Sequence, residues 1–184
     1  MVFIFSAPSG SGKSTLVNHL LTTRSDMELS ISATTRAPRG QEVDGREYYF
    51  ISQTDFEQKL RENAFVEWQQ VYKGTYYGTL KSEIDRIESA GHHVIFDIDV
   101  KGGINIKHLF GKRAVAIFVA PPSLEELRRR LTGRGTDSTE KIEERLAKAE
   151  TELADAPLFD VTIVNDNLEH AQQELDKLVK QYIG

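Results

Sequence analysis

The sequence contains no cysteine among its 184 residues. Disulfides, thiolate metal sites and cysteine nucleophiles are therefore excluded. No apolar stretch approaches the length that spans a bilayer, and the N-terminal run Val2–Phe5 is shorter than the apolar core of a signal peptide. We therefore expect a cytoplasmic protein without a membrane partner.

Positive charge is also scarce, since 23 lysines and arginines face 28 aspartates and glutamates, for a net charge of −5. Nucleic acids select positively charged surfaces, so we expect no nucleic-acid partner. A phosphate-bearing ligand must instead be held by local cationic clusters. The length predicts one compact unit, and nothing in the sequence decides between a monomer and a homo-oligomer.

A glycine-rich loop is the most specific pattern that is present. Residues 7–15 read Ala-Pro-Ser-Gly-Ser-Gly-Lys-Ser-Thr, between the apolar run Val2–Phe5 and the helical pattern of residues 16–21. A loop between a strand and a helix can wrap phosphates with backbone N–H groups. Lys13 can reach the β- and γ-phosphates of a nucleoside triphosphate, and the Ser14 hydroxyl can bind Mg²⁺. Ala7 replaces the usual first glycine, so the turn must begin at negative φ.

A first cationic cluster follows on a loop that carries Arg36 and Arg39, and two arginines three residues apart suit a monophosphate. The following segment is predicted to be rich in strands. Asp44-Gly45 predicts a hairpin between residues 41–43 and 47–51, and residues 65–68 and 71–72 predict another, closed by residues 74–79. Thr54 and Glu57 predict a capping box for a short helix that ends near residue 63.

An alternating helix and strand pattern resumes at residue 80. Residues 80–90 predict a helix, residues 94–99 a buried strand that contains Asp97 and Asp99, and residues 114–120 a core strand. Parallel sheets bind ligands at the carboxyl ends of their strands. Asp97 or Asp99 can therefore hold Mg²⁺ through water, or either can be satisfied by a helix end or an arginine.

A second cationic cluster lies between two predicted helices. Ser123 and Glu126 predict the cap of the first helix, which carries Arg128 and Arg129. A solvated helix face explains these two arginines better than a phosphate site does. Arg134 stands between two glycines, and Arg145 lies off the apolar stripe of Ile142, Leu146, Ala149 and Leu153. This arrangement predicts a lid over phosphates. Residues 159–165 predict a strand, and the final helix is predicted to bury Leu168, Ala171, Leu175, Leu178, Val179 and Tyr182.

Taken in order, these motifs resemble those of guanylate kinases over essentially the whole chain. The matching segments are residues 7–14, 32–39, 67–68, 76–78, 97–102, 134–137 and 164–166. The resemblance implies a three-layer P-loop core with a parallel sheet, made of residues 1–32, 80–123 and 156–184. It also implies a GMP-binding insertion at 33–79 and a helical lid at 124–155. Lys101 stands where the family usually has glutamine, near the acidic strand end.

The same resemblance implies ATP as phosphoryl donor, GMP as acceptor, Mg²⁺ as cofactor, and roles for particular residues. The GMP residues would be Ser32, Arg36, Arg39, Tyr48, Glu67, Tyr77, Thr79, Asp97 and Asp99. The ATP residues would be Ala7, Pro8, Ser9, Gly10, Ser11, Gly12, Lys13, Ser14, Thr15, Arg134 and Asn165. The catalytic residues would be Lys13, Arg36, Arg134 and Arg145, with Ser14 and Asp97 at the metal.

Chemistry supports guanine as the base, because Glu67 can accept hydrogen bonds from its N1–H and amino groups while Ser32 and Thr79 donate toward O6. We expect phosphorylation of GMP, and of dGMP, within purine nucleotide metabolism. A catalytically inactive interaction module with the same fold is an alternative, as is a kinase for a phosphorylated sugar. The intact Gly12-Lys13-Ser14 favours an enzyme over the module.

Overall fold

The computed structural model describes residues 1–133, 135 and 137–184. Contacts divide the chain into two compact units, one made of residues 1–27 and 95–184 and the other of residues 28–94. Among the described residues, every helix is too short or too polar to cross a bilayer.

The elements follow one another in an alternating order along the chain. The strands are β1 (Val2–Ser6), β2 (Met27–Leu29), β3 (Ala33–Thr34), β4 (Tyr49–Phe50), β5 (Phe65–Tyr72), β6 (Thr75–Leu80), β7 (His93–Asp97), β8 (Ala114–Ala120) and β9 (Val161–Val164). The helices are α1 (Lys13–Thr23), α2 (Gln53–Arg61), α3 (Lys81–Ser89), α4 (Val100–Phe110), α5 (Leu124–Gly133), α6 (Thr139–Ala154) and α7 (Leu168–Ile183). Short 3₁₀ turns are η1 (Gly111–Arg113) and η2 (Ala156–Leu158).

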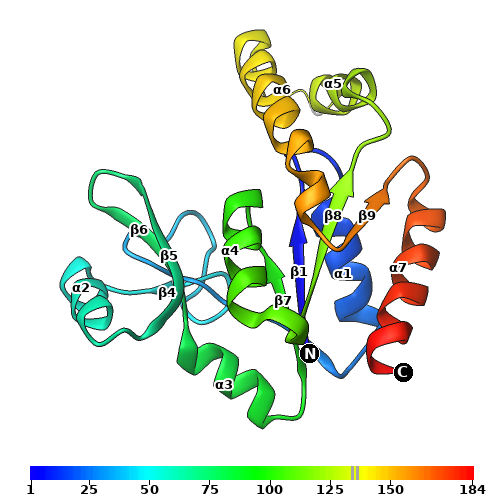
Figure 1. The fold of residues 1–184 in the computed structure, drawn as a ribbon. Coiled ribbons are helices and arrows are strands. Elements are labelled where there is room, and N and C mark those ends of the chain that lie inside the picture. The colour runs from blue at the N-terminus through cyan, green and yellow to red at the C-terminus, as the bar shows by residue number, and fades with distance from the viewer. Residues whose placement is uncertain (134, 136) are drawn as a thin grey trace. The chain divides into compact units, whose positions relative to one another are not determined.

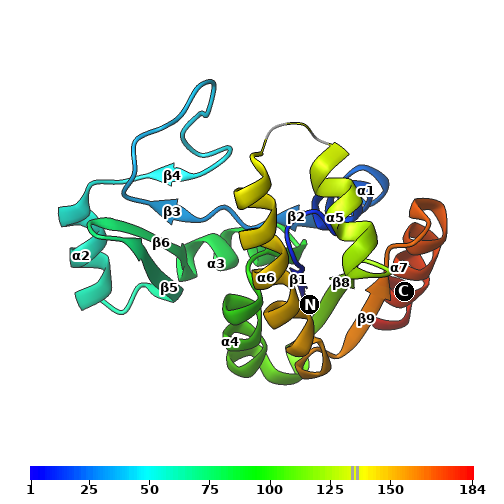
Figure 2. The same cartoon turned by 90° about the horizontal axis from the view of Figure 1, so that it is seen from above.

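A sheet in the order β2-β7-β1-β8-β9 forms the centre of the fold, and β1, β8 and β9 run parallel. These strands are almost entirely apolar, and Val2–Phe5 and residues 114–120 are buried, as expected for a sheet that is covered on both faces. Helix α4 packs on β1 and β8 from one side, while α1 and α7 pack together on the other (Figures 1 and 2). The predicted α/β fold with parallel strands is confirmed.

Helices α5 and α6 lie beyond the carboxyl ends of β1 and β8 (Figure 1). They pack on each other through a small apolar cluster of Leu127, Leu131, Ile142, Leu146 and Ala149. The predicted cap of α5 is confirmed, because the Glu126 N–H donates to Ser123 Oγ over 3.0 Å. Arg128 of α5 pairs with Glu143 of α6, so this arginine links the two helices rather than facing only solvent.

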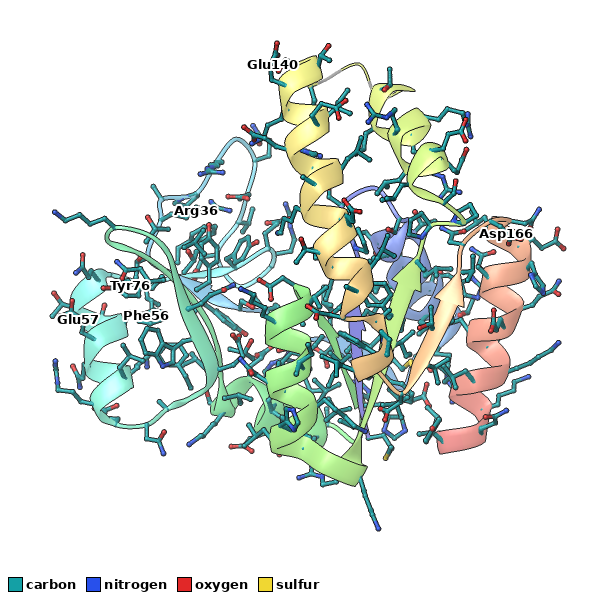
Figure 3. The ribbon with its side chains drawn as sticks, turned by 45° about the horizontal axis from the view of Figure 1, so that its top comes forward. Arg36, Phe56, Glu57, Tyr76, Glu140 and Asp166 are labelled. Atoms are coloured by element: carbon teal, nitrogen blue, oxygen red, sulfur yellow. The ribbon has the colours of Figure 1, made fainter. Side chains whose placement is uncertain are left out.

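The second unit contains a sheet in the order β4-β3-β6-β5, with α2 against one face. Phe56 of α2 is fully buried and stacks on Phe65 and Tyr76, at ring-centroid distances of 4.3 and 5.2 Å. Phe56 and Tyr76 lie together beside α2 in Figure 3. Ala33 and the partly buried Tyr49 complete this apolar face.

Both predicted hairpins are wrong in detail. Strand β4 pairs in parallel with β3, and residues 41–43 form no strand. Carboxylates hold this loop instead, because the Phe50 N–H donates to Asp44 Oδ1 over 2.7 Å and the Val43 N–H donates to Glu47 Oε2 over 2.7 Å. The second hairpin joins β5 to β6, with Gly74 at φ 78° in the turn, so residues 75–80 are a strand and not a closing loop.

Two helix predictions also need correction. The N-cap of α2 is Ser52, whose Oγ accepts from the Asp55 N–H over 3.0 Å, and not Thr54. In α7, Leu168 is 43% exposed and Tyr182 is 44% exposed, whereas the other four predicted residues are buried. Leu168 and Tyr182 stand near the two ends of the helix, where no neighbouring element covers them fully.

Candidate functional site

The glycine-rich loop connects β1 to α1 and takes its shape from two glycines. Gly10 and Gly12 have φ values of 97° and 94°, which a residue with a Cβ rarely adopts. Ala7 lies outside the positive-φ region, as predicted. The Ser11 N–H donates to the Pro8 carbonyl over 3.1 Å and closes the turn. The loop therefore turns its backbone just before α1 begins at Lys13.

Asn165 holds this loop from the carboxyl end of β9. Its Nδ2 donates to the Ser11 carbonyl over 2.8 Å, and the residue is only 6% exposed. A Cβ on Gly12 would lie 2.1 Å from the same Nδ2, so the close approach requires glycine. The backbone carbonyl of Asn165 accepts from Arg130 Nη2 over 2.8 Å. The predicted ATP residue Asn165 thus supports the loop through its side chain.

Lys13 points to the carboxyl end of β7. Its Nζ lies 2.5 Å from Asp97 Oδ1 and donates to the Ile98 carbonyl over 3.0 Å. The ammonium group can donate three hydrogen bonds, so one remains for a phosphate oxygen. The predicted residues Lys13 and Asp97 are therefore brought together by the loop and the strand end.

A polar pocket of about 420 Å³ opens beside the loop. It is lined by residues 7–10, 12–15, 97–99, Arg145, Lys148 and Glu152. The guanidinium of Arg145 donates from Nη1 to Ser9 Oγ over 3.2 Å, and its Nη2 lies 3.4 Å from Asp137 Oδ1. The structure thus brings the predicted Arg145 to the loop, whereas the predicted Arg134 lies outside the described residues.

The acidic groups of this pocket suit a divalent cation that also binds phosphates. The described residues contain no group of three or more histidine, cysteine, aspartate or glutamate side chains that could hold a metal alone. Mg²⁺ typically takes one or two protein oxygens and completes its shell with phosphates and water, and Ser14 and Asp97 fit that pattern. Asp99 has another task, because its Oδ1 accepts from the Gly102 N–H over 2.7 Å and caps α4.

The other predicted binding residues lie in the second unit, either on the sheet face opposite α2 or on the loop that joins β3 to β4. Glu67 pairs with Thr79 in the ladder of β5 and β6, whereas Phe65 pairs with Leu80. The ladder shifts between Phe65 and Glu67, so β5 carries one extra residue there. This bulge turns Glu67 away from the apolar face on which Phe65 packs. We call the face that carries Glu67, Tyr77 and Thr79 the polar face.

A chain of hydrogen-bonding groups crosses the polar face. Thr79 Oγ1 donates to Glu67 Oε1 over 3.0 Å, and Ser32 Oγ lies 3.4 Å from the same Thr79 oxygen. Thr79 is only 1% exposed, whereas Ser32 and Glu67 are half-buried. Three groups predicted to recognise one ligand are therefore neighbours on three successive segments of the sheet.

Arg36 lies at the other end of the polar face. Its Nε donates to the Tyr77 hydroxyl over 3.0 Å, and its guanidinium carbon lies 4.9 Å from the Tyr48 ring centroid and 5.6 Å from that of Phe50. Both terminal nitrogens bind the Glu42 carboxylate, at 2.6 and 2.8 Å. The predicted Arg36, Tyr48 and Tyr77 are thus brought together.

Sequence reasoning missed Glu42 and Phe50. Hydrogen bonds from Arg36 and from the Arg39 N–H, the latter over 2.8 Å, lower the pKa of Glu42 to about 2. The paired carboxylate also raises the pKa of Arg36. The spacing Arg39-x-x-Glu42 and the alternation of Tyr48 with Phe50 were the available signals. The Arg39 side chain, also predicted, is exposed on the same loop.

Glu83 of α3 was also missed, although it binds two segments of the second unit, one before β3 and one in β4. Only 2% of Glu83 is exposed, and its carboxylate accepts from the Ile31 N–H over 3.0 Å and from the Tyr49 hydroxyl over 2.9 Å. Burial alone raises the pKa of Glu83, but hydrogen bonds from Arg86, the Ile31 N–H and Tyr49 lower it overall. Glu83 thereby fixes the segment next to Ser32, and nothing in the local sequence distinguishes it from a surface glutamate.

Comparison with known proteins identifies close relatives. The family model described as guanylate kinase matches residues 1–182. A guanylate kinase from Bacteroides fragilis is 52% identical over 183 residues, which cover 100% of this chain and 90% of that protein. One from Porphyromonas gingivalis is 52% identical over 184 residues, covering 100% and 98%. The crystal structure of guanylate kinase from Anaplasma phagocytophilum superposes with a TM-score of 0.71 at 26% identity, covering 98% of this chain and 85% of that one.

Proposed function

This chain belongs to the guanylate kinase family, and we propose that it binds ATP at the pocket of the glycine-rich loop and GMP on the polar face. It is a kinase that phosphorylates GMP at the expense of ATP. The observation that carries the assignment of the acceptor site is the linked set Glu67, Thr79 and Ser32. These groups can address the N1–H, the amino group and O6 of guanine together.

Base choice follows from the donors and acceptors in this set. An ionised Glu67 accepts hydrogen bonds from N1–H and the amino group, and adenine offers neither group in that arrangement. A site with buried polar groups rejects the wrong base strongly, because those groups would be left unpaired. Thr79, with its hydroxyl between Glu67 and Ser32, fixes the spacing of the set. The set Glu67, Thr79 and Ser32 addresses only the base, so we propose that dGMP is also accepted.

The acceptor phosphate binds at the Arg36 end of the polar face. Arg36, Arg39, Tyr48 and Tyr77 supply guanidinium and hydroxyl donors there, and Glu42 keeps the guanidinium of Arg36 in place before the substrate arrives. An anionic acceptor phosphate needs no general base. The task of this cluster is to hold the attacking oxygen and to offset its charge.

The donor phosphates bind along the loop between β1 and α1. Lys13 directs an N–H to the transferred phosphoryl group, while Asp97 and the Ile98 carbonyl hold its ammonium in position. Arg145, and Arg134 on the lid, add positive charge as the bond to the leaving group breaks. Ser14 and Asp97 would hold Mg²⁺, which supplies charge neutralisation to the phosphate oxygens when it is bound.

Domain roles and cellular setting complete the proposal. Residues 33–79 form the acceptor-binding insertion, residues 124–155 the lid and the remaining segments the core. The protein acts in the cytoplasm, in purine nucleotide metabolism, as a monomer or a homo-oligomer. An acceptor screen tests the function, with ADP release followed for GMP, dGMP, AMP, IMP, CMP and UMP. We expect efficient turnover with GMP and dGMP, weak turnover with IMP because it lacks the amino group, and none with the other acceptors. Binding of GMP without turnover would support the inactive interaction module instead.

A further inference from the structure

The polar face carries one more amide side chain that the proposed acceptor site does not yet use. In the ladder of β5 and β6, Glu67 faces Thr79 and Gln69 faces Tyr77. Residues two apart in a strand point to the same side, so Gln69 lies on the polar face with Glu67. Gln70 faces Tyr76 instead, on the side of α2, and both glutamines are exposed.

The positions of the base-binding and phosphate-binding residues fix the orientation of the nucleotide on this face, one across the strands and the other along them. Glu67, Thr79 and Ser32 lie on adjacent segments, so the guanine edge from the amino group to O6 runs across the strands. Arg36 donates to the hydroxyl of Tyr77, and Tyr77 lies two residues before Thr79 in β6, on the same face of the sheet. The path from base to phosphate therefore runs along the strands, in the direction that leads from Glu67 to Gln69.

This orientation turns the remaining edge of guanine toward β5. Beyond the amino group that Glu67 binds, this edge carries the second amino hydrogen and then N3, an acceptor. We propose that Gln69 binds this edge, with its carbonyl oxygen accepting from the amino group and its NH₂ donating to N3. A carboxamide matches a donor next to an acceptor in bidentate fashion. The inference rests on the proposed function and adds a determinant for 2-aminopurine nucleotides.

Neighbouring residues of the same type provide the test and its control. The KM and kcat of the wild type, Gln69→Ala and Gln70→Ala are measured with GMP, dGMP and IMP, which lacks the amino group. We expect Gln69→Ala to raise the KM for GMP and dGMP roughly tenfold, the loss typical of one bidentate base contact. The rise with IMP should be clearly smaller. Gln70→Ala should match the wild type with all three acceptors, and thermal unfolding midpoints should agree among the three proteins.

Each other outcome overturns a stated part of the proposal. Equal KM values for GMP in Gln69→Ala and Gln70→Ala would remove Gln69 from the site. An equal loss with GMP and IMP would exclude the amino group as its target, and a loss with GMP but not dGMP would assign Gln69 to the ribose 2′-hydroxyl. If the wild type itself does not phosphorylate GMP, the proposed function fails before this inference is tested.

Discussion

The side-chain amide of Asn165 donates to the backbone carbonyl of Ser11 over 2.8 Å, although 154 positions separate the two residues. The contact joins the segment just after β9 to the glycine-rich loop, which we propose binds the donor phosphates. The Ser11 carbonyl belongs to a buried residue, so it depends on this amide for its hydrogen bond. The shape of the glycine-rich loop is therefore supported by a residue that directly follows β9.

Replacing Asn165 by alanine should loosen the loop as well as the fold. The unsatisfied carbonyl is expected to lower the free energy of unfolding by about 1–3 kcal/mol and to raise the KM for ATP while the KM for GMP stays unchanged. Asn167→Ala is the control, because Asn167 caps α7 by accepting from the His170 N–H over 3.1 Å. Its loss should cost about 1 kcal/mol of stability without changing the KM for ATP. Equal effects of both variants on ATP would contradict the loop-holding role.

Lys13→Ala should lower kcat by several orders of magnitude and leave GMP binding largely intact, because we propose that the ammonium group contacts the transferred phosphoryl group. Stopped-flow turnover and calorimetric GMP binding check the two parts. Lys107→Ala is matched in its contacts, since Lys107 Nζ lies 2.7 Å from Asp160 Oδ2 and donates to the Ala114 carbonyl over 2.8 Å. It should affect stability only. Retention of more than about a tenth of turnover in Lys13→Ala would exclude Lys13 from the chemistry.

Glu67→Gln should lower kcat/KM for GMP by a factor equivalent to at least about 2 kcal/mol of transition-state stabilisation. The reason is that an amide NH₂ would then face the N1–H of the bound guanine and leave that N–H without an acceptor. Steady-state kinetics with GMP measure the loss. Glu57→Gln, on α2 and on the other side of the sheet, is the control and should match the wild type (Figure 3). Unchanged GMP kinetics in Glu67→Gln would make Glu67 a structural residue of the hairpin.

Arg36→Lys keeps the charge but removes the planar fork that binds Glu42 and stacks on Tyr48. We expect the KM for GMP to rise about tenfold or more, because the lysine cannot hold both contacts and the phosphate at once. Arg46→Lys on the same loop is the comparison, since Arg46 makes a surface pair with Glu47 that contributes little. A KM within error of the wild type in both variants would show that Arg36 acts only as a charge.

The buried carboxylate of Glu83 should make stability depend on acidic pH. Its pKa is lowered below the ordinary 4.5, so the folded state favours the ionised form more than the unfolded chain does. The corresponding stability is present at neutral pH and is lost as pH falls below about 4.5 toward the folded-state pKa. Urea unfolding from about pH 6 to about pH 3 should show this decline, and Glu83→Gln should flatten it. The same pH dependence of the free energy of unfolding in both proteins would contradict a lowered pKa of Glu83 in the folded state.

Local patterns were sufficient for the elements whose signals lie in adjacent residues. The apolar run of residues 114–120 is β8 without any change of bounds. The glycine-rich motif of residues 7–15 forms the loop between β1 and α1 and the first residues of α1, as predicted. Helix α4 escaped prediction because Gly102 and Gly103 weaken the helical pattern. A Cβ on Gly103 would lie 2.4 Å from Ser6 Oγ, so packing on β1 explains this glycine. That reason is visible only once the helix and the strand are in contact.

For the candidate site, the sequence predicted residue types better than it predicted partners. Arg36 and Tyr77 were both expected in the GMP site, but the carboxylate that binds Arg36 came from Glu42, which no motif singled out. The Asp44-Gly45 pair indicated a hairpin, yet the Asp44 carboxylate binds the Phe50 N–H and shapes a loop. Such side-chain to backbone contacts compete with strand pairing, and sequence periodicity does not record them.

The extra residue in β5 between Phe65 and Glu67 has a consequence for how this hairpin changes over evolutionary time. In a regular strand, losing or gaining one residue exchanges the two faces and would bring a carboxylate among the aromatic rings. At the bulge, a residue can be removed while Glu67 stays opposite Thr79 and Phe65 stays opposite Leu80. The ladder shifts again between Gln70 and Tyr72, which gives a second such position. The strand can therefore lose a residue at either of these two points without moving Glu67 off the polar face or Phe65 off the apolar face.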